Sequence, residues 1–284
     1  MKHAYLIAAH NNFAHLQRLI RLLDDKDTYF FVHIDKKSSV PDSLRKMKTT
    51  NPLTVLNEYK VEWGDSSIVK MELALFQESL KVKEIEWFHL ISGNDFPLKP
   101  AAEIRSFYDN STDVDCFMEH EPFPSSMRYR NELYHLYIRR RSDSNGFLMW
   151  FNDKLNALQS LIGVKRKPID GLPYRYGSNW VDLRRRAVEL LVDRRQRIMR
   201  KIRFTLIPDE MYIQTFLQND GLRVVNDNRR YIDWSEGKPS PKSLEEDDYK
   251  AVMSSGKLFA RKFDTPQSEK LADLILKPRS QILD

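Results

Sequence analysis

Alternation of buried strands with amphipathic helices in the first 120 residues limits the folds open to this chain more than any other feature. Apolar runs typical of strands occupy residues 5–9, 29–34, 52–56, 87–91 and 115–118. Apolar residues at helical spacing lie between them, at 13–23, 67–80 and 101–108. This order predicts an α/β fold with a mainly parallel central sheet and helices on both faces. Ligands bind beyond the carboxyl ends of such strands, where Asp35 and Asn94-Asp95 are expected.

The second half of the chain is less regular, and Pro122 and Pro124 interrupt it first. The patterns there predict helices at 150–162, 181–200, 209–217 and 244–254, and short strands at 224–225 and 231–233. No internal repeat, low-complexity stretch or long linker separates the two halves. We therefore expect one domain that spans residues 1–284.

Cysteine content and apolar runs indicate the compartment. A single cysteine, Cys116, excludes an intrachain disulfide and a cysteine-rich zinc site. The apolar run that opens the chain ends at polar His10-Asn11-Asn12, too early for a signal peptide. No apolar run approaches the roughly 20 residues of a membrane span. These features lead us to expect a cytoplasmic protein.

Positive charge is modest in total but unevenly placed. The net charge is +6, and basic residues crowd the segment 184–203, with smaller groups at 139–141 and 165–167. A solvated helix face explains such a segment, and so does peripheral contact with an anionic membrane or a polyanionic acceptor. Nucleic acid is not expected as a partner, because no aromatic-basic interleaving or zinc-finger spacing accompanies the charge.

The tripeptide Pro208-Asp209-Glu210 is the strongest candidate for chemistry. Pro208 favours the first turn of a helix, so both acids are expected in that turn, where free backbone N–H groups hold a carboxylate. Asp209 is expected to support the turn, and Glu210 to face a cleft. Ordinary helix-start acids are the alternative interpretation of this tripeptide.

Six motifs that run in order along the chain resemble one enzyme family. They are Ala4-Tyr5-Leu6-Ile7 with His10, His33-Ile34-Asp35-Lys36-Lys37-Ser38, Ile91-Ser92-Gly93-Asn94-Asp95-Phe96-Pro97-Leu98, Gly177-Ser178-Asn179-Trp180, Pro208-Asp209-Glu210, and Leu258-Phe259-Ala260-Arg261-Lys262-Phe263-Asp264. Together they resemble the core-2/I-branching enzymes, β-1,6-N-acetylglucosaminyltransferases related to peptide O-xylosyltransferases (glycosyltransferase family 14). The resemblance covers residues 4–264.

This resemblance implies a GT-A-like fold, a UDP-sugar donor, inversion at the anomeric carbon and no divalent metal or other cofactor. It also implies that residues from about 1 to 120 bind the nucleotide sugar, and that about 121–284 carry the acceptor site and the catalytic residue. GlcNAc is the sugar expected first, moved to a hydroxyl of a glycan or lipid-linked glycan. The single cysteine and the lack of an anchor differ from the animal members and suggest a bacterial-type member.

The resemblance also assigns roles to individual residues. Glu210 matches the catalytic base. The residues expected on the donor side are Asp35, Lys242, Arg261, Lys262, His10 and Asp95. Lys262 matches a diphosphate contact, Lys242 aligns less securely, and Arg261 exchanges roles with Lys262 after a small shift in register. A lone lysine in either place is equally explained as a solvated surface charge.

Acceptor contacts are expected at Glu119, at Arg128 or Arg130, and at Trp234, which matches an aromatic platform for a sugar ring. Core packing is the alternative for Trp234 and the preferred interpretation for Trp180. Glu236 stands where the animal branching enzymes carry an aromatic residue, which leaves the acceptor open.

A metal site and other functions are the alternatives to this prediction. Asp113-Val114-Asp115 resembles a metal-binding DxD motif, but it is expected at the start of a strand. His10, His33 and His89 share no ligand spacing and are expected to be structural. The alternatives are a UDP-xylose-dependent enzyme, a metal-dependent transferase of the same fold, and a non-catalytic module that binds membranes or polyanions.

Overall fold

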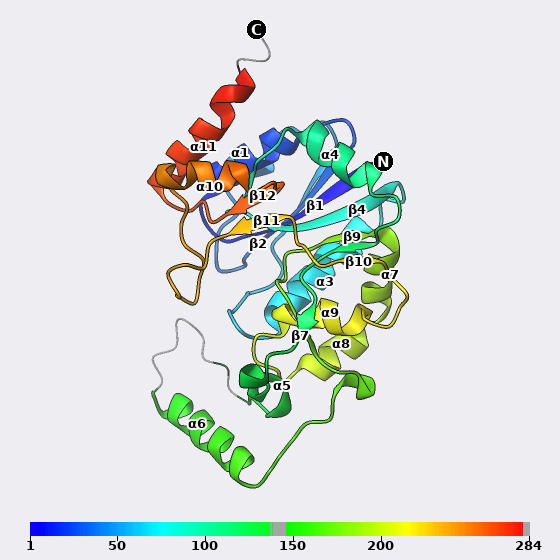
Figure 1. Cartoon of the computed structure of the whole chain (residues 1–284), viewed down its shortest axis with the longest axis vertical. Coiled ribbons are helices and arrows are strands. Elements are labelled where there is room, and N and C mark those ends of the chain that lie inside the picture. The colour runs from blue at the N-terminus through cyan, green and yellow to red at the C-terminus, as the bar shows by residue number, and fades with distance from the viewer. Residues whose placement is uncertain (137, 139–145, 281–284) are drawn as a thin grey trace.

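A computed structural model describes residues 1–136, 138 and 146–280 of the chain (Figure 1). In this part of the chain the main sheet has seven strands, ordered β10-β6-β9-β4-β1-β2-β3. Their bounds are β1 Lys2–Ala9, β2 Thr28–Ile34, β3 Leu53–Leu56, β4 Ile85–Ser92, β6 Cys116–Phe117, β9 Asp182–Arg184 and β10 Val224–Val225. Parallel pairing joins β3, β2, β1 and β4, whereas β9 runs antiparallel to both β4 and β6. The predicted α/β fold with a mainly parallel sheet is confirmed.

Helices cover both faces of this sheet because successive side chains of a strand point to opposite faces. Ala4 and Leu6 of β1 pack toward α3 (Ser67–Ser79), α7 (Arg185–Asp193) and α9 (Tyr212–Leu217). Tyr5 and Ile7 pack toward α1 (Phe13–Leu23) and α4 (Ala101–Asn110). A smaller core lies under α10 (Tyr249–Ser254) and α11 (Pro266–Ser280). The predicted helices of the first half are confirmed, with the bounds of 13–23 matched.

The segment from 181 to 200 is not the long basic helix that its charge pattern predicts. It forms β9, then α7, then α8 (Arg195–Ile202). Burial explains the difference, because Val181, Asp182 and Leu183 are all inaccessible and the strand inserts between β4 and β6. Five arginines of this segment donate to the body of the protein, namely Arg184, Arg185, Arg186, Arg194 and Arg195. Their guanidinium groups therefore already hold hydrogen-bond partners within the molecule.

Two further helix predictions need correction. The helix expected at 209–217 begins only at Tyr212, because residues 208–210 form a separate 3-10 turn. The helix expected at 244–254 is likewise a 3-10 turn at Glu246–Asp248 followed by α10. The helix expected at 150–162 is α6 (Gly146–Leu161). The remaining helical elements are α2 (Asp42–Arg45), α5 (Tyr129–Glu132), and the 3-10 turns Ser125–Met127 and Ile169–Gly171.

The carboxyl ends of the central strands meet at one edge, as predicted. The backbone N–H of Asp35 donates to the carbonyl of Ala9 over 2.9 Å, and that of Gly93 to Ala8 over 2.8 Å. A side chain at Gly93 would bring its Cβ to 2.8 Å from that of Ala9, so the approach requires glycine. This edge brings the polar residues that follow β1, β2 and β4 together.

Two small sheets extend this edge. One has the order β11-β12-β5, with bounds Arg230–Ile232, Phe259–Arg261 and Phe96–Pro97, and the other pairs β7 (Glu121–Pro122) with β8 (Arg175–Tyr176). The strands predicted at 224–225 and 231–233 correspond to β10 and β11. Strands from the second half of the chain thus complete the sheets begun by the first.

A buried ion pair links β9 to β11. Arg230 donates to both carboxylate oxygens of Asp182, over 2.7 and 2.8 Å, and both side chains are inaccessible. A ring nitrogen of His89 lies 2.9 Å from Asp182, and its other ring nitrogen lies 2.9 Å from His3. The structural role expected for His89 is thereby confirmed. His33 is also structural, since its Nε2 accepts from the backbone N–H of Tyr59 over 3.3 Å.

Within the described residues, no helix has both the length and the apolar character needed to cross a membrane. The basic group at 139–141 lies outside the described residues.

Candidate active site

Glu210 is held by a 3-10 turn of residues Pro208–Glu210 rather than by the first turn of an α-helix. Ile207, which precedes this turn, has a φ of 53°, a left-handed conformation rare for a β-branched residue. Its backbone N–H donates to the carbonyl of Gly64 over 2.7 Å. Strained backbone of this kind gathers at functional sites, and here it directly precedes the turn that carries Glu210.

The loop that anchors this turn carries Trp63, a residue that the sequence analysis missed. Trp63 is 58% exposed and directly precedes Gly64. On its other side, Lys37 donates to the carbonyl of Val61 over 2.7 Å and lies 3.2 Å from the carboxylate of Glu62. The loop therefore connects the segment after β2 to the Glu210 turn and carries an exposed indole.

Arg130 is the basic partner of Glu210. Its Nη1 donates to Oε2 of Glu210 over 2.9 Å, and the glutamate side chain remains 31% exposed. The sequence left Arg128 and Arg130 as equal candidates, and the structure brings only Arg130 to the carboxylate. Arg128 is exposed one position before α5. Glu210 is thus both oriented by a cation and open to solvent.

Gly177 packs against the backbone carbonyls of both Glu119 and Glu210. Its backbone N–H donates to the carbonyl of Glu210 over 3.0 Å. A Cβ at this position would lie 2.1 Å from the carbonyl oxygen of Glu119 and 2.8 Å from Nε2 of Gln214. Only glycine permits this approach, which explains why the motif at residues 177–180 begins with Gly177.

Glu119 follows β6 at the carboxyl edge of the sheet. Its Oε2 accepts from the backbone N–H of Ser178, and its Oε1 accepts from the side chain of Asn228, each over 2.9 Å. Both oxygens are therefore engaged, and Glu119 ties the Gly177 turn to β11. Asn228 gave no signal in the sequence, because its role depends on a partner more than one hundred residues away.

Arg261 forms the cationic side of the site. It is only 9% exposed, and its guanidinium stacks on Trp180 at 4.3 Å from the ring centre. Its Nε lies 3.6 Å from Oδ1 of the fully buried Asp95, which exceeds a hydrogen bond. Among the described residues, Nε and Nη1 of Arg261 have no hydrogen-bond partner. Buried donors without partners are rare in native proteins, so these two nitrogens set Arg261 apart from an ordinary structural arginine.

Trp180 joins the acidic and cationic sides. It was expected to be core, and it is partly buried against the core beneath α3 and α9. Its outer face, however, carries the Arg261 guanidinium. Because Gly177 contacts Glu210 and Trp180 contacts Arg261, residues 177–180 span the site from the candidate base to the candidate anion contact.

Lys262 and Lys242 lie beside Arg261 and are each paired with an acid. Lys262 Nζ is 2.6 Å from Asp264, and Lys242 Nζ is 2.7 Å from Asp248. The backbone N–H of Leu244 donates to the carbonyl of Lys262 over 2.9 Å, which brings the two segments together. Both lysine side chains keep a quarter or more of their surface exposed.

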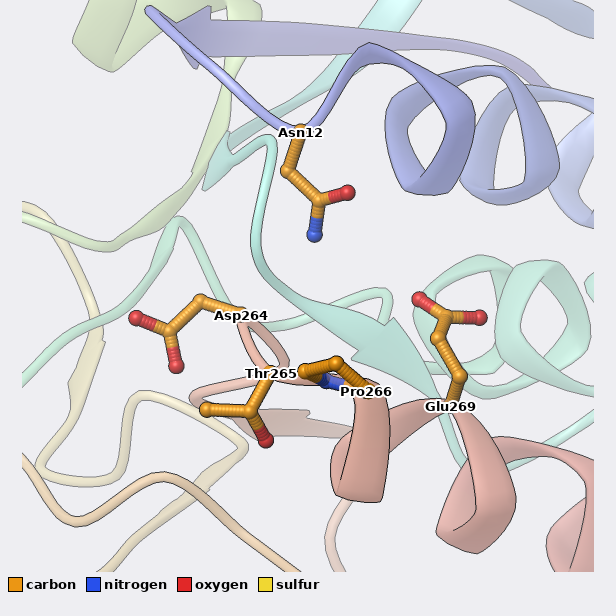
Figure 2. A pocket seen from close by; sticks show the side chains of 5 residues that line it. All are labelled: Asn12, Asp264, Thr265, Pro266 and Glu269. Carbon is orange, nitrogen blue, oxygen red and sulfur yellow. The ribbon is translucent and has the colours of Figure 1, made fainter.

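A pocket of about 320 Å³ opens next to Lys262 (Figure 2). Figure 2 shows the Asn12 amide and the Glu269 carboxylate beside this hollow, whereas the Asp264 carboxylate points away from both. Asp264 is the partner of Lys262, and Glu269 binds Arg18. The amide of Asn12 donates to the carbonyl of Phe263 over 3.4 Å, so the pocket lies where β1 and β12 end. Glu210 is not part of its lining.

Asp35 and His10 follow β2 and β1 at the same edge. Asp35 is 6% exposed, and its Oδ1 accepts from the backbone N–H of Lys37 over 2.9 Å. His10 is exposed, and its carbonyl accepts from the hydroxyl of Ser38 over 2.6 Å. Both follow strands, as the sequence predicts, and Asp35 already braces the turn after β2.

Trp234 is 54% exposed in the loop after β11, which excludes core packing for this residue. The same loop leads to Lys242, whose backbone N–H donates to the carbonyl of Asp233 over 2.8 Å. The aromatic platform expected from the resemblance is thus accessible.

The Asp113-Val114-Asp115 motif lies away from this edge. Asp115 precedes β6, as expected, and its Oδ2 accepts from the backbone N–H of Arg223 over 2.9 Å. Asp113 is exposed opposite the Arg223 guanidinium. Both acids therefore stand at the amino end of β6, whereas Glu119 follows its carboxyl end.

Two buried acids lie beneath Glu210. Asp209 is 7% exposed, and its Oδ1 has no partner among the described residues. Burial, and then the neighbouring Glu210, raise the pKa of Asp209 to about 7. Burial also raises the pKa of Glu72 well above its usual value, although the Asn179 amide donates to Glu72 over 3.1 Å. Ionisation of Asp209 therefore destabilises the folded state. The sequence predicts only a supporting role for Asp209 in the turn and does not predict this effect.

We expect Asp209→Asn to stabilise the protein at alkaline pH. Because the folded-state pKa lies above the unfolded value near 3.8, wild-type stability falls as pH rises from about 4 to about 7. A shift of roughly 3 units corresponds to about 4 kcal/mol. The asparagine variant has no such ionisation, so its unfolding free energy in urea should exceed the wild-type value at pH 8 but not at pH 4.5. Asp247→Asn, at an exposed site, should show no such trend, and a pH-independent difference for Asp209→Asn would contradict the burial argument.

Comparison with known proteins places this arrangement in a family. The family model for the core-2/I-branching enzymes matches residues 3–255. Xylosyltransferase 2 of Canis lupus familiaris is 25% identical over 96% of this chain, and xylosyltransferase 2 of Homo sapiens is 24% identical over 96%. A xylosyltransferase of Ciona intestinalis is 22% identical over 82% of the chain.

These matches cover about a third of the mammalian relatives and 27% of the Ciona protein. The family match itself extends over most of the chain, from β1 to α10, and includes Glu119, Gly177 and Glu210. The chain therefore belongs to the core-2/I-branching enzyme family.

Proposed function

We propose that the chain is an inverting, metal-independent glycosyltransferase with a GT-A-like fold, which moves a sugar from a UDP-sugar to a hydroxyl of an acceptor. The observation that carries this proposal is the segment 177–180, which contacts the Glu210 turn at one end and Arg261 at the other. A displacement at an anomeric carbon requires these two functions side by side, a proton acceptor and an anion contact. Family membership supports the same reaction class.

Glu210 would act as the general base. Its exposed carboxylate takes the proton of the acceptor hydroxyl while that oxygen forms a bond to C1 of the sugar. The bond from C1 to the diphosphate oxygen breaks at the same time, and its electron pair leaves with UDP. Attack opposite the leaving group converts an α-linked donor into a β-linked product. The hydrogen bond from Arg130 fixes the direction of the carboxylate.

Arg261 and Lys262 would hold the leaving diphosphate. Arginine suits this role because its planar donors pair with phosphate oxygens, and Arg261 has two donors without a protein partner. Lys262 would exchange Asp264 for phosphate when the donor binds. Asp95 would act through Arg261, because it is fully buried. Cations at this place supply the charge stabilisation that a metal supplies in other transferases.

The relatives favour xylose over GlcNAc as the sugar, because each is named a xylosyltransferase. UDP-xylose therefore moves ahead of UDP-GlcNAc, although the sequence resemblance gave the opposite order. Trp234 offers the acceptor an exposed ring on which an apolar sugar face stacks. Incubation with a panel of UDP-sugars and free saccharide acceptors tests the reaction, and NMR coupling of the product's anomeric proton should give a β-linkage.

We expect UDP to bind in excess EDTA, with Lys262→Met weakening the affinity about 10- to 100-fold. One charge-assisted hydrogen bond to phosphate is worth about 1.5–3 kcal/mol, which corresponds to that range. Isothermal calorimetry measures both effects. Lys270→Met, a change at an exposed lysine of α11, should leave the affinity unchanged. Binding that requires manganese, or equal affinities for Lys262→Met and wild type, would overturn the proposed anion contact.

A further inference from the structure

Exposed hydrophobic side chains gather on one part of the molecule. Of the fourteen large hydrophobic residues that are exposed in the described part of the chain, ten lie between residues 129 and 162. Most of them belong to α6, which Figure 1 shows at the periphery, away from the main sheet. A soluble surface rarely concentrates apolar groups in this way without a partner for them.

Five of the six large hydrophobic residues that are exposed on α6 form one stripe. Phe147, Trp150, Phe151, Leu158 and Leu161 follow the spacing of a single helical face. Their exposed fractions are 67%, 55%, 47%, 51% and 84%. Ile162, directly after the helix, is 65% exposed and continues the stripe. At 1.5 Å per residue, the 16 residues of α6 make a stripe about 24 Å long.

The helix contacts the body of the protein through a polar residue. Gln159 is 6% exposed, and its side-chain oxygen accepts from the backbone N–H of Tyr134 over 2.8 Å. Its side-chain nitrogen donates to the carbonyl of Tyr134 over 3.1 Å. A surface helix of a globular protein normally turns its apolar face inward. In α6 the buried contact is polar and the apolar stripe faces outward.

The end of α6 is fixed to the same body. Shortly after the helix, the backbone N–H of Arg166 donates to the carbonyl of Glu132 over 2.8 Å, and its guanidinium donates to the carbonyl of Lys201 over 2.7 Å. These bonds hold the carboxyl end of the helix against α5 and α8. The outward direction of the stripe is therefore set by the fold at this end.

Positive charge accompanies the stripe. Lys154 lies within it, and Lys165 and Lys167 follow it, all three exposed. Asp153 is the only acidic residue of the sequence between 146 and 167. Two copies of α6 that packed stripe to stripe would bring Lys154 of each against apolar groups and like charge. At a lipid surface, the lysine stem lies along the acyl boundary while its ammonium reaches the phosphates.

We propose that α6 is an interfacial helix that seats the enzyme on an anionic lipid bilayer, with its apolar stripe inserted and its lysines among the headgroups. The charge pattern also predicts membrane contact at the 184–203 segment, but five arginines there already donate to the protein's own backbone and side chains. The lipid surface is the partner that matches both the apolar stripe and the cationic residues beside it. This role does not depend on the proposed catalysis.

Co-sedimentation with phosphatidylcholine vesicles, with and without 30% phosphatidylglycerol, tests the helix. The full chain should bind the anionic vesicles, and binding should weaken as salt rises. Phe151→Ser with Leu158→Ser should lower the partition coefficient at least about tenfold, because two inserted side chains are lost. Lys154→Gln with Lys165→Gln and Lys167→Gln should remove most of the preference for anionic lipid.

Controls separate this proposal from its alternatives. Met253→Ser changes an exposed hydrophobic residue of α10 and should bind vesicles like wild type. Thermal unfolding by circular dichroism checks that each variant is folded. No binding by the wild type, or equal binding by the serine double variant, would overturn the proposal. A dimer in lipid-free buffer that this double variant dissociates would assign the stripe to a second copy instead.

Discussion

Replacing Glu210 with glutamine should lower kcat by about 10²–10⁴-fold, the range typical for loss of a general base. The amide keeps the size of the side chain and still accepts a hydrogen bond from Arg130, but it cannot take the proton of an acceptor hydroxyl. Affinity for UDP should stay within about twofold, because the anion contact lies at Arg261 and Lys262. Initial rates with saturating donor and acceptor, together with calorimetry, measure the two quantities.

A matched control is Glu121→Gln, two residues after Glu119. Glu121 is exposed on β7, and its carboxylate accepts from the Asn226 side chain rather than facing the Glu210 turn. Its turnover should stay close to wild type. If Glu210→Gln retains near-normal turnover, or if the product linkage is α, the assignment of the base fails. The family and the fold would remain.

The sequence predicted the strand ends of the site correctly because they are local signals. A buried apolar run followed by Asp35, or by Asn94-Asp95, marks a strand and its carboxyl end without knowledge of any distant partner. The parallel order of the strands then fixes that these ends share one edge. The backbone hydrogen bonds from residues 35 and 93 to the end of β1 confirm that these strand ends share one edge.

The remaining features depend on partners far along the chain. Asp182 of β9 is buried because Arg230, 48 residues further along the chain, neutralises it. Without that partner in view, the sequence pattern assigns Asp182 to a basic surface helix. The choice of Arg130 over Arg128 is set by the position of the Glu210 turn. The sequence alone gives no sign that Arg261 is buried, because its neighbours Trp180 and Asp95 are distant in the chain. Local patterns carry no information on such pairs.

The buried pair of Asp182 and Arg230 should contribute more to stability than any surface pair of this protein. Arg230→Met should lower the unfolding free energy by about 3–5 kcal/mol at pH 7, because removal of one partner leaves the other charge buried and uncompensated. Nη2 of Arg230 also donates to the carbonyl of Leu90 over 3.1 Å, a bond that methionine cannot replace. Urea unfolding followed by fluorescence measures this loss.

The pH dependence of that loss identifies its origin. Burial alone would raise the pKa of Asp182, but Arg230 and His89 outweigh burial and hold it at about 2. A carboxyl with a depressed pKa stabilises the fold above its unfolded pKa near 4, and this stabilisation is lost as pH falls toward 2. In Arg230→Met the aspartate regains the raised pKa that burial favours. The variant's deficit should therefore be largest near pH 7 and should shrink toward pH 3.5, where Asp182 is protonated without penalty.

Arg223→Met provides the matched comparison. Arg223 and its partner Asp113 are each 72% exposed and 3.7 Å apart, and such pairs contribute at most about 1 kcal/mol. If Arg230→Met costs no more than Arg223→Met, the pair does not stabilise the fold. If its cost is equal at pH 3.5 and pH 7, the lost stability reflects packing rather than the Asp182 charge. We expect a loss that depends on pH, because the Asp182 charge is tolerated in the core only while Arg230 faces it. Asp182 also begins β9, the strand that directly follows residues 177–180 of the site.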